Sequence, residues 1–233
     1  MKVLLILLFV FEYMGSFAQQ NKLSYGINYS LDYNNVVDDD GRVSKIPNPT
    51  YKSGTGYTFG INLKSVINTN SSFETGIQLI SYNGERSYID SYGYSRYQHS
   101  YQFISIPFNY LRYLNQGDLR FFSTIGICLA YRNIKKYDYT LVSSRGFTST
   151  TDLSDVNESP ADKTFIGVMF AVGISYTFKD NYEIRFSPYT SLMSRPRGLV
   201  DAYNVLPYII GVNTAFLLKP FHIRSIRQTY MHP

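Results

Sequence analysis

The feature that most constrains this chain is an alternation of large apolar residues with small or polar ones. In residues 164–178, Ile166 and Val168 alternate with Gly167 and Met169. Successive strand residues point to opposite faces of a sheet, so this period of two predicts β-strands with one apolar face. The alternation recurs in eight segments, residues 22–33, 55–66, 72–82, 98–114, 118–132, 164–178, 182–193 and 204–218. Because no segment has a helical period of comparable quality, we expect an all-β fold.

The connections between these segments alternate in length. Short turns are expected at residues 68–71, 115–117 and 179–181. Long polar connections are expected at residues 34–54, 83–97, 133–163 and 194–203. Short periplasmic turns and long extracellular loops are typical of outer-membrane barrels. An even number of strands also puts both ends of the barrel on the short-turn side, so the pattern predicts an eight-stranded antiparallel transmembrane β-barrel.

The volume of the side chains decides which face of the barrel is outside. An eight-stranded barrel has an interior just wide enough to be filled by side chains. One face of the predicted strands is nearly all Ile, Leu, Val, Phe and Tyr, which would overfill that interior, whereas the other face is mostly Gly, Ala, Ser, Thr and Asn. We therefore expect the large apolar side chains to face lipid. The sheet must then close into a barrel, because open strand edges do not occur in the hydrocarbon core of a membrane.

Three prolines fall inside the predicted strands, at Pro107, Pro188 and Pro207. Proline has no backbone N–H and cannot donate to a strand ladder. We expect a bulge or a locally broken ladder at Pro107, the one nearest mid-barrel.

The two ends of the chain are expected to lie outside the barrel. Lys2, the apolar run of residues 3–11 and the small-x-small site at residues 16–18 form the pattern of a secretory signal peptide. The expected division is therefore a signal peptide over residues 1–18, an outer-membrane barrel over 19–218 and a periplasmic C-terminal tail over 219–233. The predicted location is the outer membrane of a Gram-negative bacterium, with outer-membrane lipid around the barrel.

Composition excludes several other classes of protein. A single cysteine, Cys128, rules out an intrachain disulfide framework and a zinc site built on cysteines. The formal net charge of +5 is not concentrated in a dense Lys/Arg block, so we expect no nucleic-acid partner. No motif points to a cofactor.

Five charged residues on the predicted lumen face lie next to the short turns. They are Lys64, Glu74, Arg120, Glu183 and Arg185. All five are therefore expected at the periplasmic end of the lumen. Unpaired buried charges are costly, so we expect them to form an ion-pair network. The alternative is that they face periplasmic water at the barrel mouth.

The connection at residues 83–97 is rich in tyrosine. Tyrosine among small polar residues suits adaptable contacts, and the same residues suit an aromatic girdle at the membrane interface or an extension of the hairpin. The candidate extracellular contact surface consists of Tyr88, Tyr92, Tyr94 and Tyr97.

Catalytic and metal-binding residues are not expected. The adjacent His99 and Ser100 point to opposite faces of a strand, so they cannot form a nucleophile–base pair directly. His222 and His232 lie in the tail. Three consecutive carboxylates, Asp38 to Asp40, precede Gly41 but lack the spacing of a calcium loop, so a solvated turn is the simpler interpretation.

Residues 101–131 contain an aromatic or aliphatic strand with Ile106-Pro107, a basic residue and tyrosine at Arg112-Tyr113, a turn, and a strand rich in Gly and small residues over 122–131. In these features the segment resembles the PorT-type outer-membrane β-barrel proteins of Bacteroidota. Ser105 stands where the family often has an acidic residue. The resemblance implies an outer-membrane barrel; some members are tied to protein secretion.

Two classes of function follow from these observations. The first is a non-enzymatic barrel with a filled lumen that is a structural or accessory component of an envelope or secretion complex, with a protein of that complex as partner. The alternative is a surface-binding barrel that acts in adhesion or ligand capture through its long, Tyr-rich extracellular loops.

Overall fold

The structure is a computed structural model of the chain, and it describes residues 23–38, 50–90, 93–143, 145–152, 163–179, 181–194 and 205–219. The strands of these residues are β1 (Leu23–Asp38), β2 (Thr50–Asn68), β3 (Ser71–Asp90), β4 (Gly93–Tyr113), β5 (Leu119–Ser143), β6 (Thr148–Asp152), β7 (Thr164–Phe178), β8 (Tyr182–Ser194) and β9 (Val205–Leu218). The predicted signal peptide and all of the predicted tail beyond Lys219 lie outside the described residues. In the described part of the chain, no helix is long and apolar enough to cross a membrane.

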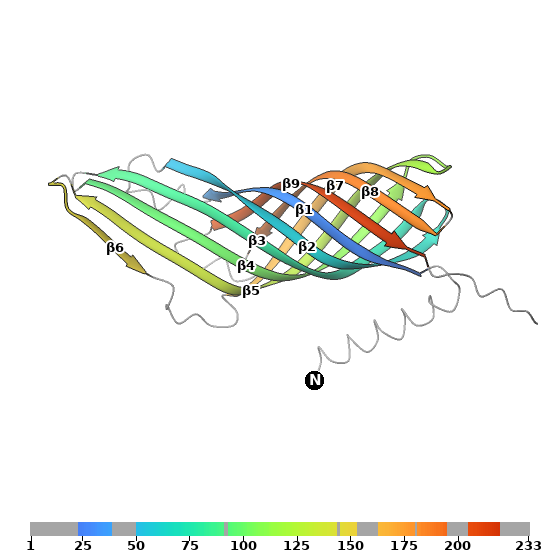
Figure 1. Cartoon of the computed structure of the whole chain (residues 1–233), viewed down its shortest axis with the longest axis horizontal. Helices are drawn as coiled ribbons and strands as arrows, with labels where there is room; N and C mark the ends of the chain where they lie inside the picture. Colours follow the sequence, from blue (N-terminus) through green and yellow to red (C-terminus); the bar gives the residue numbers. More distant parts are fainter. Residues whose placement is uncertain are drawn as a thin grey trace, which may run out of the picture.

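Eight of the strands form a closed antiparallel barrel (Figure 1). Each of β1, β2, β3, β4, β5, β7, β8 and β9 pairs with its neighbours in that order, and β1 pairs with β9 to close the wall. Tyr25 near the start of β1 pairs with Leu218 at the end of β9, so both described ends lie at the same end of the barrel as the short turns. The predicted eight-stranded antiparallel barrel is confirmed.

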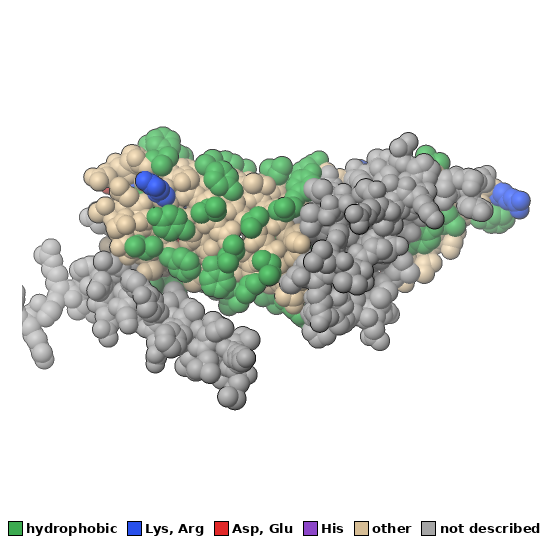
Figure 2. All heavy atoms as spheres, turned by 180° about the vertical axis from the view of Figure 1, so that it is seen from behind, with side chains coloured by type: hydrophobic (Ala, Val, Ile, Leu, Met, Phe, Trp, Pro, Cys, Tyr) green, Lys and Arg blue, Asp and Glu red, His purple; other side chains and the backbone are tan. Residues whose placement is uncertain are grey.

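The predicted orientation of the two faces is also confirmed. On β1, Ile27 and Leu31 are exposed to the outside, whereas Asn28 and Ser30 are buried in the lumen. Apolar side chains are spread over the barrel wall in the same way (Figure 2). An apolar outer wall around a polar interior is the reverse of a soluble barrel and is the arrangement of a barrel that faces lipid.

Two prolines interrupt the strand ladders without shifting the register. Between β3 and β4 the pairing runs from Thr75–Phe108 to Gln78–Ser105 and omits the positions around Pro107. The same gap occurs beside Pro188 on β8. Each proline leaves a ladder broken on one side only, because β4 and β8 keep their other neighbours throughout. The expected local break at Pro107 is therefore present, with no bulge.

The connections expected at residues 83–97 and 133–163 are largely strand. β3 and β4 stay paired up to Asp90 and Gly93, and β5 continues to Ser143 before β6 pairs back on it. These strands extend as one sheet past the start of β7, with residues 50–53 of β2 paired beside β3. We call residues 83–90, 93–102, 133–143 and 148–152 the projecting sheet (Figure 1). The difference from the sequence expectation arises because these segments mix apolar residues such as Ile89, Leu141 and Val142 with charged and polar ones, so the apolar period of two that marks a wall strand is absent.

Candidate functional site

The structure brings the five inward charges together at the short-turn end of the lumen. Lys64 lies on β2, Glu74 on β3, Arg120 on β5, and both Glu183 and Arg185 on β8. Glu183 is completely buried, and Lys64 is only 2% exposed. We call these five residues the lumen charge cluster.

The carboxylate of Glu183 is the centre of this cluster. Lys64 Nζ lies 2.5 Å from Glu183 Oε2, and Ser175 donates a hydrogen bond of 2.8 Å to Glu183 Oε1. The Arg120 guanidinium lies 3.9 Å from the same carboxylate. The second carboxylate, Glu74, accepts a hydrogen bond from the Arg185 guanidinium. Each carboxylate is thus matched by a cation, which offsets the cost of removing the charges from water.

Tyr113 links the members of the cluster, and the sequence analysis did not single it out. Its hydroxyl accepts a hydrogen bond from Lys64 at 2.6 Å and donates one to Glu183 at 2.9 Å. Its ring lies 3.9 Å from the Arg120 guanidinium carbon. The sequence could have indicated this. Tyr113 is four residues after the lumen residue Asn109 on the same strand, so the two side chains are expected on the same face.

A second polar group surrounds Asp32 in the middle of the lumen. Three hydroxyl groups donate to its carboxylate, from Ser30 at 2.8 Å, Thr58 at 2.7 Å and Tyr189 at 2.7 Å. Hydrogen bonds to an ionised carboxylate are roughly twice as strong as those between neutral groups. A buried carboxylate is therefore stabilised here by hydroxyl donors.

A cavity of about 60 Å³ lies between these two polar groups. It is lined by polar side chains such as Asn28, Asn109 and Arg185 and by apolar ones such as Ile80 and Met169. Among the described protein atoms, the side-chain oxygens of Asn28 and Asn109 have no hydrogen-bond partner. A cavity of this size with such polar groups accommodates a few water molecules.

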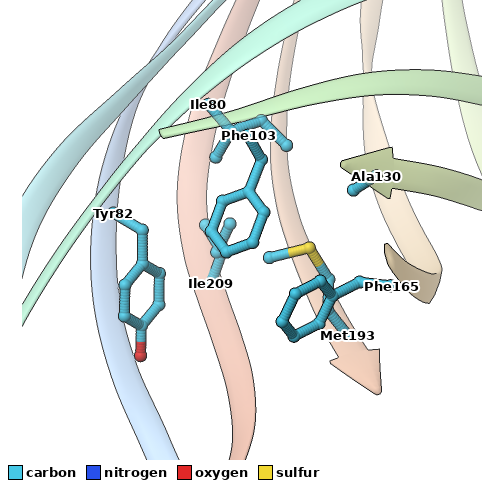
Figure 3. Close-up of a cluster of buried hydrophobic side chains, with 7 residues drawn as sticks. All are labelled: Ile80, Tyr82, Phe103, Ala130, Phe165, Met193 and Ile209. Atoms are coloured by element: carbon cyan, nitrogen blue, oxygen red, sulfur yellow. The ribbon is translucent and has the colours of Figure 1, made fainter. Parts of the chain in front are cut away.

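A cluster of large apolar side chains fills the lumen on the other side of the cavity. Its members are Ile80, Tyr82, Phe103, Ala130, Phe165, Met193 and Ile209 (Figure 3). The rings of Phe103 and Phe165 meet edge to face with centroids 5.2 Å apart. We call these seven residues the apolar plug. Although the lumen face of the predicted strands consists mostly of small residues, the structure closes the long-loop side of the lumen with aromatic and aliphatic side chains.

The candidate tyrosine surface falls in the hairpin of β3 and β4. Tyr94 pairs with Ile89 on β3 and with Val142 on β5. Tyr88 pairs with Ser95, and Tyr97 pairs with Arg86 and Tyr139. Tyr92 lies outside the described residues. The hairpin extension considered for this segment is therefore present.

The outer strand of the projecting sheet is β6, which joins β5 through a tight turn. Ser143 donates its N–H to Phe147 O at 2.8 Å, and Gly146 donates to Ser143 O at 2.9 Å. Gly146 has a φ of 84°, a conformation that glycine adopts without steric cost. This is the three-residue hairpin loop in which a left-handed residue completes a bulge. All five residues of β6 are exposed.

The described residues contain no group of three or more His, Cys, Asp or Glu side chains placed to hold a metal ion. Asp39 and Asp40 of the acidic run lie outside that part of the chain, as do His222 and His232. His99 is a strand residue of β4, paired with Gly84 and Tyr137.

No protein family model matches the chain, and no curated protein matches it. Solved structures match it at low sequence identity. Neisserial surface protein A is 14% identical, with a TM-score of 0.41 and coverage of 84% of this chain and 97% of that one. The outer membrane protein OprG from Pseudomonas aeruginosa is 9% identical, with a TM-score of 0.36 and coverage of 83% and 94%. The outer membrane protein AlkL, solved in lipid bilayers, is 13% identical, with a TM-score of 0.36 and coverage of 85% and 90%.

Proposed function

We propose that this protein is a non-conducting, non-enzymatic barrel of the outer membrane of a Gram-negative bacterium that presents its projecting sheet to partners outside the cell. The barrel anchors the sheet, and the contact surface lies on the sheet rather than in the lumen. This is the surface-binding alternative of the two functions considered from the sequence. The PorT-type resemblance of residues 101–131 supports the outer-membrane part of the proposal.

The single observation that carries the proposal is the continuation of β3, β4 and β5 past the barrel wall. The paired strands run to Asp90, Gly93 and Ser143, whereas β7 begins only at Thr164, which pairs with Tyr131 on β5. About ten residues of each long strand thus extend beyond that point, roughly 33 Å at 3.3 Å per residue. A sheet of this length is not needed to cross the bilayer, so we infer that it serves contact.

The filled lumen argues against transport. The lumen charge cluster occupies one end, and the apolar plug occupies the other. An eight-stranded barrel has no room for an aqueous channel once side chains of this size fill it. Among the described residues, those outside the lumen, on the barrel wall, the short turns and the projecting sheet, are left to meet a partner.

The remaining function is an accessory role in an envelope or secretion complex, with contacts on the periplasmic side or on the barrel wall. One experiment separates the two. Residues 86–97 are replaced by Asn-Gly, which joins Glu85 to Gln98 by a two-residue turn. A second variant joins Asp138 to Asp152 in the same way. A matched control replaces the opposite turn, Thr69-Asn70, by Asn-Gly.

Intact cells that carry each variant are cross-linked, and the barrel is purified after a heat-shift assay has shown that it is folded. We expect wild-type protein and the turn control to retain a surface component that at least one shortened variant loses. A complex that both shortened variants retain would contradict the proposal and favour the accessory role.

A further inference from the structure

The outward face of the described barrel wall carries a single charged side chain, Arg112 on β4. The wall segments are residues 23–37, 55–68, 71–82, 103–113, 119–132, 164–178, 182–194 and 205–218 of the eight strands. The other charged residues of these segments all belong to the lumen face: Asp32, Arg132 and the lumen charge cluster, none of which is exposed. Arg112 is exposed, whereas its chain neighbours Leu111 and Tyr113 are buried in the lumen. Its side chain therefore points outward, away from the lumen.

Apolar and aromatic side chains surround Arg112 on the wall. Tyr110 and Leu114, two residues before and after it on the same face, are 43% and 69% exposed. On β5, Ser123 is directly paired with Arg112, and the exposed Phe121 lies two residues nearer the short turn. Because Leu114 and Phe121 lie on the short-turn side of Arg112, the charge is at the margin of the apolar wall and not beyond it.

This outward charge lacks a partner in the described part of the chain. Arg112 makes no ion pair or side-chain hydrogen bond there, and the hydroxyl of Ser123 makes no hydrogen bond. The serine on the other side, Ser71, donates its hydroxyl to Asn68 at 2.7 Å. A charge on the lipid face destabilises a barrel, least near the interfaces, and long basic side chains extend toward the headgroups. An anion at the headgroup level would offset that cost.

The donors at this site match a phosphate group. The guanidinium is planar and presents paired N–H donors that bind two phosphate oxygens at once, and the hydroxyl of Ser123 adds a third donor. The apolar surface continues from the site toward the middle of the wall through the exposed residues Ile106 and Ile127. A headgroup phosphate on Arg112 would place the acyl chains of its lipid along this surface. A carboxylate of a protein would match the guanidinium as well, but it would leave the apolar surroundings without a matching ligand.

From this arrangement we propose that Arg112 and Ser123 bind the phosphate of a phospholipid in the membrane leaflet at the short-turn end of the barrel. The acyl chains of this lipid lie along the apolar wall toward the middle of the membrane. The site goes beyond the proposed function, since it lies on the wall and not on the projecting sheet. Both shortened hairpin variants retain it, so the two proposals succeed or fail independently.

The first test measures the contact in a bilayer. The protein is labelled with carbon-13 at the guanidinium carbon of its arginines and folded into bilayers of phosphatidylglycerol and phosphatidylethanolamine. Carbon–phosphorus dipolar dephasing in solid-state NMR then identifies arginines beside a lipid phosphate. We expect a dephased signal that Arg112→Gln removes. The control Arg145→Gln, which removes an exposed arginine at the tip of the projecting sheet, should retain it. Identical dephasing in the wild type and in Arg112→Gln would overturn the proposal.

The second test measures how firmly the lipid is held. The folded protein is extracted into a neutral detergent, mixed with phosphatidylglycerol and measured by native mass spectrometry, after a heat-shift assay has shown that each variant is folded. We expect Arg112→Gln to retain about tenfold less lipid than the wild type, because hydrogen bonds to charged groups are the strong ones. Arg112→Lys, which keeps the charge but not the paired donors, should fall between the two, and Ser123→Ala should lose less. Lys179→Gln removes an exposed positive charge at another short turn and should bind as the wild type does. Equal retention by the wild type and Arg112→Gln would contradict the proposal.

Three further measurements identify the ligand. Diacylglycerol with the same acyl chains lacks the phosphate, and its equal retention would mean that the apolar wall alone holds the lipid. Inorganic phosphate lacks the acyl chains, and displacement of phosphatidylglycerol by an equal concentration of it would indicate a site for a free ion. A protein that cross-links in native membranes to the wild type and not to Arg112→Gln, with unchanged phosphorus dephasing, would assign Arg112 to a protein partner. Each of these three results would overturn the proposal.

Discussion

Lys64 forms its ion pair with Glu183 at 2.5 Å, although its direct neighbour across the ladder of β2 and β3 is Glu74. Glu74 instead pairs with Arg185 on β8. Both ion pairs therefore cross the lumen and connect β2 and β3 with β8. The interior charges tie opposite walls of the barrel together, which neighbouring pairs along one ladder could not do.

Removal of Glu183 should destabilise the barrel strongly. Glu183→Ala leaves Lys64 buried without its nearest carboxylate, and breaking a buried pair in this way costs about 3–5 kcal/mol. The measurement is the urea unfolding midpoint of the protein refolded into lipid vesicles. Glu85→Ala is the matched control, because its pair with Arg96 is partly exposed and such pairs contribute about 0–1 kcal/mol. Equal midpoints for the two variants would show that the lumen charge cluster adds no stability.

A cavity made in the apolar plug should destabilise the barrel to a similar extent. Phe103 is fully buried against Phe165, and a buried Phe→Ala substitution costs about 3–5 kcal/mol. Phe147→Ala provides the comparison, since that side chain is 76% exposed at the tip of the projecting sheet. We expect a lower unfolding midpoint for Phe103→Ala only. A wild-type midpoint for Phe103→Ala would mean that the plug is not packed as described.

Closure of β1 on β9 predicts heat-modifiable migration in detergent gels. The two strands are paired from Tyr25–Leu218 to Asp38–Val205, so no edge of the wall is open along this length. A closed barrel with its backbone bonds satisfied resists detergent until it is boiled. Boiled and unboiled samples of the folded protein should therefore migrate differently. Identical migration would contradict closure.

The turn at Arg145 and Gly146 should be accessible from outside the cell. It lies at the far end of the projecting sheet, opposite the short turns, whereas Ser149 is part of β6 and a tag there would break the strand. An epitope inserted between Arg145 and Gly146 should bind antibody on intact cells. A tag at Thr69-Asn70 should bind only after permeabilisation, and the reverse result would invert the topology.

The barrel wall could be predicted from the sequence because lipid imposes a strict rule. Outward residues at membrane depth are predominantly apolar, so alternation such as that around Ile166 and Val168 identifies both the strand and its orientation. The projecting sheet escaped prediction because this rule does not apply in water. Residues such as Glu85 and Arg96 on that sheet are polar and carry no such period.

The interior was predicted less completely. The position of Lys64 and Glu183 near short turns could be inferred from strand parity alone. Their pairing across the lumen could not, since it depends on the stagger of strands that are distant in the sequence. The apolar plug could have been predicted. Phe103, Phe165 and Met193 occupy the alternate strand positions that face the lumen, and they lie toward the long-loop ends of their strands.

The central claim is that the lumen is filled, so that the protein acts from its outer surfaces. Its most direct test is planar-bilayer recording of the purified, folded barrel. With the lumen charge cluster at one end and the apolar plug at the other, we expect no stable conductance above the bare bilayer, because the interior of an eight-stranded barrel holds no channel once side chains fill it. Stable, porin-like current steps from folded protein would contradict this account.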